Sequence, residues 1–194
     1  MSLNHTSGVT AQWHKLVSDA QIASGISLEK PIKSYLIYTL IQYTQRPDIA
    51  ARIFAIDYLL ANQEQGHVRT NQLRDLADQC LLYAGLFPQY SKRRNVRVSY
   101  YVDIGRSAYS DISNCYHDEK DIYAELSDKF VALMDTLLAI HHIDKQESHA
   151  FILEPETALQ TWQDTQSQQA LKILQQQIKS DNIVDFTQHR TNKH

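Results

Sequence analysis

The chain has 194 residues, of which 43% are hydrophobic and 21% are charged, and these values are normal for one well-cored globular domain or one domain with an appendage. Five glycines and four prolines argue against an all-β fold, because such a fold needs many turns. A net charge of −3 and a pI of about 6.3 argue against a protein that binds nucleic acid through overall positive charge.

The sequence predicts a cytoplasmic protein that does not enter a membrane. Its N-terminus lacks the basic region and apolar run of a signal peptide, and no stretch of about 20 apolar residues occurs. Cys80 and Cys115 both lie in helical patterns, so we expect two reduced thiols rather than a disulfide.

Two amphipathic helices are predicted before residue 46. Apolar residues at helical spacing place the first over 9–24, and Gly25 is expected to end it. Ser27 is a candidate cap for the second helix, which has Pro31 in its first turns, where a missing N–H costs little.

A third helix is predicted after Pro47 and a fourth after Thr70, the candidate cap of that helix. Gly85 is expected to end the fourth helix. The apolar face of the third is expected to consist of Ile49, Ile53, Ile56, Leu59 and Leu60.

The stretch 96–104 fits two patterns. Apolar and polar residues alternate along it, as in a strand, but apolar residues from Val98 onward also recur at helical spacing. Because a lone strand has no partner in an otherwise helical chain, we predict a helix over about 97–115. Gly105 lies inside it, and a close contact with another helix would account for that glycine.

The C-terminal half is predicted to contain two further helices, a long one over about 118–143 and a last one over 155–179. We expect 144–154 to be a linker and 180–194 to be a polar, disordered tail. The prediction is therefore an all-α bundle of six or seven helices, with 9–143 as its domain.

Three stretches of the chain carry a resemblance to a known family. They read RDLADQCLLYAGLFP, RRNVRVSYYVDIGRSAYSDIS and FVALMDTLLAI, within about residues 50–140. This pattern resembles a family of uncharacterised helical proteins of proteobacteria. The resemblance implies a bacterial cytoplasmic origin and carries over no activity and no site.

The sequence contains no catalytic, nucleotide-binding or metal-binding motif, so neither a cofactor nor a metal is predicted and the question of an enzyme stays open. Asp75 and Asp78 are spaced as paired carboxylates, but a solvated helix face with Arg74 or Arg106 as partner explains them more simply. The histidines of the C-terminal half are best explained as helix-end residues rather than ligands; they are His141, His142 and His149.

Positive charge is concentrated in the middle of the chain. Residues 66–109 carry net +4, whereas residues 110–194 carry net −7. The first function hypothesis is a non-enzymatic interaction protein whose basic, tyrosine-containing surface contacts an acidic protein or an anionic ligand. The residues predicted for that surface are Lys92, Arg93, Arg94, Arg97, Tyr100, Tyr101 and Arg106.

Other interpretations stay open. The basic cluster can be a solvated loop, or it can pair with the acidic half inside the fold. Nucleic-acid binding is a further alternative. An enzyme or small-molecule receptor would instead use a polar pocket between helices, and its predicted residues are Arg74, Asp78, Asp103, Arg106 and Tyr109. A sparse apolar stripe on the last helix also makes a homodimer through that helix one interpretation.

Overall fold

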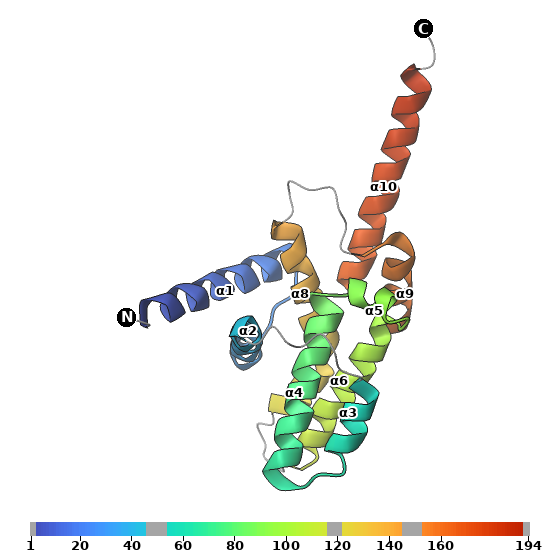
Figure 1. Ribbon diagram of the computed structural model, residues 1–194. Coiled ribbons are helices and arrows are strands. Elements are labelled where there is room, and N and C mark those ends of the chain that lie inside the picture. The colour runs from blue at the N-terminus through green and yellow to red at the C-terminus, as the bar shows by residue number, and fades with distance from the viewer. Residues whose placement is uncertain (1–2, 46–53, 116–121, 145–152, 192–194) are drawn as a thin grey trace.

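The computed structural model describes residues 3–45, 54–115, 122–144 and 153–191, and all regular secondary structure in these ranges is α-helical (Figure 1). The ten helices are α1 (Leu3–Ser24), α2 (Lys30–Gln45), α3 (Phe54–Ala61), α4 (Gly66–Gly85), α5 (Gln89–Arg93), α6 (Val98–Ser113), α7 (Ile122–Asp128), α8 (Phe130–Asp144), α9 (Pro155–Thr165) and α10 (Gln168–Thr191). The all-α prediction is confirmed, but the count exceeds six or seven. Within the described ranges, no helix has the length and apolar character needed to cross a membrane.

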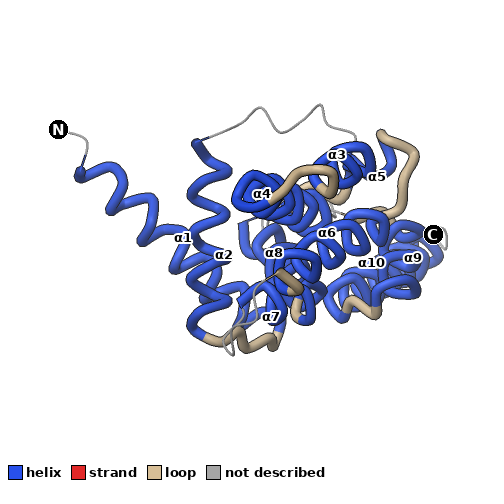
Figure 2. The backbone as a smooth tube through the Cα atoms, turned by 90° about the horizontal axis from the view of Figure 1, so that it is seen from below, coloured by secondary structure: helices blue, strands red, loops and turns tan. Residues whose placement is uncertain are grey.

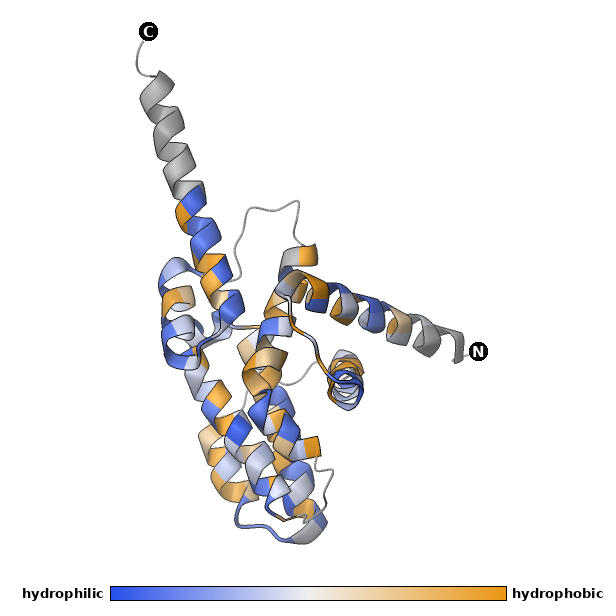
Figure 3. Cartoon of the chain, turned by 180° about the vertical axis from the view of Figure 1, so that it is seen from behind, coloured by the Kyte–Doolittle hydropathy of each residue, from blue (hydrophilic) through white to orange (hydrophobic). Residues whose placement is uncertain are grey.

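The centre of the bundle consists of α4, α6 and α8, which pack against one another. α1 and α2 lie on one side of this centre, and α9 and α10 lie on the opposite side (Figure 2). α10 projects away from the bundle beyond its first turns (Figure 1). α8 is mainly apolar, whereas the coloured part of α10 next to the bundle alternates between polar and apolar residues (Figure 3). This difference matches the central position of α8.

The stretch whose pattern fits both strand and helix is α6, as predicted. Its buried residues recur at intervals of three and four: Val98, Tyr101, Val102, Gly105, Ala108, Tyr109 and Ile112. A helix is favoured because α4 and α8 offer it apolar surfaces, whereas no described element offers a strand edge to pair with.

Two glycines allow the central helices to approach closely. A Cβ atom at Gly105 would meet the Phe130 ring of α8 and lie 3.1 Å from Cβ of Cys80 on α4. A Cβ atom at Gly85 would lie 2.5 Å from Cβ of Leu137. The approaches to the Phe130 ring and to Leu137 are far inside van der Waals contact, so the close helix contact expected at Gly105 is present.

The predicted last helix is divided at Gln166, which has a left-handed backbone (φ 60°) and ends α9. Ser167 then caps α10, because its hydroxyl accepts a hydrogen bond from the Ala170 N–H at 3.0 Å. The buried carboxylate of Asp135 on α8 accepts hydrogen bonds from the Ser167 hydroxyl and from the Gln168 N–H. A single helix was therefore the wrong prediction, since local capping restarts the helix on a new axis.

The predicted long helix is likewise divided, at Lys129 between α7 and α8. The Lys129 ammonium lies 2.7 Å from the carboxylate of Glu29 before α2. α10 runs to Thr191, into the stretch expected to be a polar tail. The acidic residues expected to open the long helix, and most of the predicted linker 144–154, lie outside the described residues.

Several predicted boundaries and faces are wrong. α1 begins at Leu3 rather than at residue 9, and α4 begins at Gly66, so Thr70 lies inside α4 and is not its cap. On α3 the buried residues are Phe54 and Ala61. The residues expected to be buried on α3 are instead about half exposed or more: Ile56, Leu59 and Leu60. Ile49 and Ile53 lie outside the described residues.

Candidate functional site

The basic cluster lies on α5 and at the start of α6, where it faces α9. Lys92 forms an ion pair with Glu154, and Arg97 lies 3.2 Å from Asp164. The Asp164 carboxylate also accepts a hydrogen bond from the Ser99 hydroxyl at 3.0 Å. The Lys92–Glu154 pair is largely exposed, whereas the Asp164 side chain of the second pair is partly buried, and both pairs join the basic middle of the chain to its acidic C-terminal part.

The other two cations of the cluster lie over aromatic rings. The Arg94 guanidinium lies 5.3 Å from the centre of the Tyr83 ring and 5.7 Å from that of Phe54. The Arg93 guanidinium lies 5.1 Å from the centre of the Tyr90 ring. Cation–π contacts of this kind stabilise the fold, so the four predicted cations all have partners within the chain.

The predicted aromatic part of the basic surface differs from expectation. Tyr101 is fully buried and stacks on Tyr83 with a centroid separation of 5.4 Å, so its inclusion in an exposed surface was wrong. The Tyr100 hydroxyl accepts a hydrogen bond from the Ala55 N–H, so its polar end contacts α3. Arg106 is exposed on α6.

Replacing Lys92, Arg93, Arg94 and Arg97 together by glutamine is expected to lower the melting temperature by a few degrees. The reason is that two ion pairs and the contacts with three rings are lost together. A thermal melt followed by circular dichroism measures the change. The matched control carries four glutamines at exposed cations that have no ion-pair partner among the described residues: Lys15, Lys30, Arg106 and Lys179. Equal melting temperatures of the two variants would contradict the prediction.

The predicted polar pocket is assembled only in part. Asp78 accepts a hydrogen bond from Tyr109, and Arg74 lies one turn away on the same helix. Arg74 pairs with its neighbour Asp75 at 3.3 Å, and not with Asp78 as its spacing suggested. Asp103 and Arg106 are exposed on α6 and do not belong to this group.

Asp78 is the acceptor of a network between three helices. The hydroxyls of Tyr35 on α2 and Tyr109 on α6 donate to its Oδ1 at 2.7 and 2.6 Å. Burial raises the pKa of Asp78 to about 6, although the two hydroxyls act in the opposite direction. Burial also raises the pKa of Tyr35 and of Tyr109 well above the usual range, so both remain hydroxyl donors. Tyr123 lies edge-on to the Tyr35 ring.

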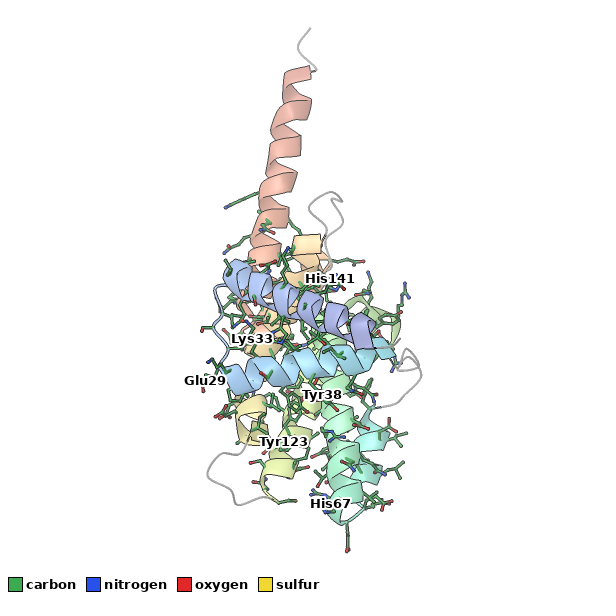
Figure 4. All side chains as sticks on the ribbon, turned by 90° about the vertical axis from the view of Figure 1, so that its left-hand side faces the viewer. Glu29, Lys33, Tyr38, His67, Tyr123 and His141 are labelled. Atoms are coloured by element: carbon green, nitrogen blue, oxygen red, sulfur yellow. The ribbon has the colours of Figure 1, made fainter. Side chains whose placement is uncertain are left out.

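A groove of about 230 Å³ lies beside this network, between α2 and α4. Its walls include Tyr38, Thr39 and Tyr43 from α2 and Arg74, Asp78 and Gln79 from α4. Figure 4 shows Tyr38 where α2 crosses the upper end of α4, and Tyr123 below α2. The groove therefore has aromatic side chains on one wall and a carboxylate on the other.

Two buried oxygen atoms of the groove-lining residues are unsatisfied. Thr39 is only 3% exposed, and neither its Oγ1 nor the Oε1 of Gln79 has a hydrogen-bond partner among the described residues. In contrast, the helical residues Thr136 and Thr161 donate to the carbonyl four residues earlier. An unsatisfied buried polar group costs free energy, so such a pair beside a carboxylate calls for an explanation.

The histidines give no metal site within the ranges described. His141 Nε2 lies 2.7 Å from the carbonyl oxygen of Leu86, just beyond the end of α4. No group of three or more potential ligand side chains is brought together among the described residues. The side chain of His142 and all of His149 are outside them.

Tyr35, Thr39 and Gln79 were missed by sequence reasoning. A usable signal exists on α2, where Tyr35, Thr39, Gln42 and Tyr43 follow one another at helical spacing along one face. Polar atoms on a face that packs against another helix need partners there. That this face of α2 meets Asp78 and Gln79 could not be recognised, because it depends on how α2 crosses α4.

The fold and the groove together define a helical bundle with a polar, tyrosine-edged groove between two of its helices. Searches of protein-family models, of curated proteins and of solved structures find no match to this chain.

Proposed function

We propose that this protein binds a small polar molecule in the α2–α4 groove. The observation that carries the proposal is the unsatisfied hydroxyl of Thr39, which is buried at the groove beside Asp78 and Gln79. Ligand sites characteristically combine an apolar or aromatic wall with a few polar groups that fix the orientation of the ligand. A ligand that hydrogen-bonds Thr39 and Gln79 would remove the free-energy penalty of both groups.

The binding test uses three small aromatic probes of similar shape and different charge: 2-phenylethylamine, 2-phenylethanol and 3-phenylpropionate. Each is titrated into the ¹⁵N-labelled full chain while amide chemical shifts are recorded. The proposal expects at least one probe to shift, saturably, the amides of Tyr38, Thr39 and Gln79. Shifts scattered over the surface, or none with any probe, would overturn it.

Replacing Thr39 by valine is expected to raise the free energy of unfolding by about 1 kcal/mol, because an unsatisfied buried hydroxyl is replaced by a methyl group of similar shape. The same variant is expected to weaken probe binding. Urea unfolding at pH 7.5 measures the stability.

The control is Thr136→Val, whose hydroxyl donates to the carbonyl of Ala132 at 2.8 Å. This variant is expected to lose about 1 kcal/mol and to bind the probes unchanged. A loss of stability in Thr39→Val equal to that of the control would show that the Thr39 hydroxyl is satisfied in the free protein.

The basic surface is a second candidate, as the docking site of an acidic protein segment. It is supported by two clefts that both include Lys92, of about 360 and 400 Å³. The larger cleft also includes Arg93. This candidate ranks second because the other cleft carries two cations against three carboxylates, those of Glu154, Glu156 and Asp164.

Separately from this second candidate, we propose a homodimer through the C-terminal helix. The projecting course of α10 (Figure 1) and the half-exposed side chain of Ile178 support it.

A further inference from the structure

We infer that the ligand of the α2–α4 groove is a protonated amine attached to an apolar or aromatic group. This inference rests on the proposed function, and it adds the chemical class of the ligand. It is carried by the kind of polar atoms that remain unsatisfied at the groove and by the charge and rings around them.

The polar atoms of the groove that lack a hydrogen-bond partner among the described residues are oxygens that can accept a hydrogen bond. Gln79 Oε1 can only accept a hydrogen bond, and Thr39 Oγ1 can accept one. The carboxylate of Asp78, whose Oδ1 accepts from both tyrosine hydroxyls, supplies a third acceptor oxygen at the groove. An ammonium group has three N–H donors and no acceptor, so it matches these three oxygens in number and in kind.

The charges around the groove favour the same class. The Arg74 guanidinium pairs with the carboxylate of Asp75 at 3.3 Å, whereas Asp78 forms no ion pair among the described residues, although the Arg74 charge still acts to lower the pKa of Asp78. The groove residues therefore carry net negative charge when Asp78 is ionised. An anionic ligand would meet Asp78 with no free cation beside it, which is unfavourable.

Tyrosine rings provide the remaining complementarity. Tyr38 is 57% exposed at the groove, and Tyr43 is half-buried against Phe87. The face of a tyrosine ring attracts cations, and its apolar surface also suits the organic part of an amine. A hydrated metal cation would make no use of that apolar surface.

The test uses the probe series of the previous section with a second variant. At pH 7.5 we expect the affinity for 2-phenylethylamine to be at least about tenfold higher than the affinity for 2-phenylethanol. We expect 3-phenylpropionate not to bind. Asp78→Asn is expected to lower the affinity for the amine about tenfold and to leave the affinity for the alcohol unchanged. Asparagine retains an acceptor for both tyrosines, and Asp103→Asn is the control because it makes the same charge change at an exposed carboxylate outside the groove.

Failure of the inference is distinguishable from failure of the proposed function. If the alcohol and the amine shift the groove amides with equal affinity, or if Asp78→Asn binds the amine like the unmodified protein, the groove binds ligands but the amine class is wrong. Tight binding of the carboxylate probe would also overturn the amine class. If no probe shifts the groove amides, the groove itself is not the site. If Asp103→Asn weakens amine binding as much as Asp78→Asn, the effect is one of overall charge and the inference fails.

Discussion

Replacing Gly85 by alanine is expected to lower the free energy of unfolding by about 2–3 kcal/mol. An added Cβ at this position would lie 2.5 Å from Cβ of Leu137, 2.9 Å from its Cδ1 and 3.1 Å from the carbonyl oxygen of Met134. The Cβ atom and the carbonyl belong to the rigid part of α8, so relief requires α4 and α8 to separate. Chemical denaturation of the purified variant measures the loss.

Two comparisons make this prediction specific. Gly8→Ala on α1 is the matched control, because a Cβ atom there meets nothing within 4 Å, and alanine is the better helix former by about 1 kcal/mol. Gly105→Ala should fall between the two, since its nearest neighbours belong to the edge of the Phe130 ring, which can rotate more easily than α8 can move. A Gly85→Ala variant as stable as Gly8→Ala would show that α4 and α8 pack less closely than described.

Replacing Asp78 by asparagine is expected to raise the free energy of unfolding at pH 8 by about 1–3 kcal/mol. The pKa of Asp78 is about 6 in the folded protein and close to the ordinary value of 3.8 in the unfolded chain. The folded state therefore holds the proton more tightly, and ionisation of Asp78 destabilises the fold as pH rises from about 4 to about 6. Asparagine has no such ionisation and still accepts from both tyrosines.

The difference between variant and unmodified protein is consequently small near pH 4, grows up to about pH 7 and is constant above it. The two tyrosines that donate to Asp78 and the neighbouring arginine keep their charge over this range: Tyr35 and Tyr109 stay neutral, and Arg74 stays cationic. Burial also raises the pKa of Asp135, but this contribution is common to both proteins. A difference that does not change between pH 4 and pH 8, measured by urea unfolding, would mean that Asp78 titrates normally.

Local patterns in the sequence were sufficient for the class of fold and for the single most ambiguous element. The helical spacing of Val98, Tyr101 and Tyr109 identified α6, and an internal glycine at 105 pointed to a close helix contact. Periodicity does not reveal which apolar face finds a neighbour. On α3 the stripe at Ile56 and Leu59 is exposed. The apolar character of a helix face can be read from the local sequence, but its burial depends on contacts between segments distant in sequence.

The candidate site was predictable on α4 and α6 but not on α2. Asp78 and Tyr109 were identified because they are polar residues in helical patterns, but their partner Tyr35 lies 43 positions before Asp78. The basic cluster illustrates the converse. Four cations between residues 92 and 97 suggested an exposed surface, but the tertiary structure supplies the carboxylates of Glu154 and Asp164 and rings from α3 and α4. A cluster of charges in the sequence shows where oppositely charged or aromatic partners are needed. It does not show whether those partners come from the same chain or from another molecule.

The Asp135 carboxylate links the start of α10 to the middle of α8, across 32 positions of sequence. The first turn of α10 therefore lacks part of its capping until α8 has formed and is in place, so this helix is expected to appear late in folding. The same contact also affects how the native protein opens, because α10 needs α8 for its capping whereas α8 does not need α10. We expect α9 and α10 to detach as one cooperative unit while α4, α6 and α8 stay assembled, and loss of α8 to release α10 with it. We therefore expect amide exchange to be faster in α9 and α10 than in α4, α6 and α8.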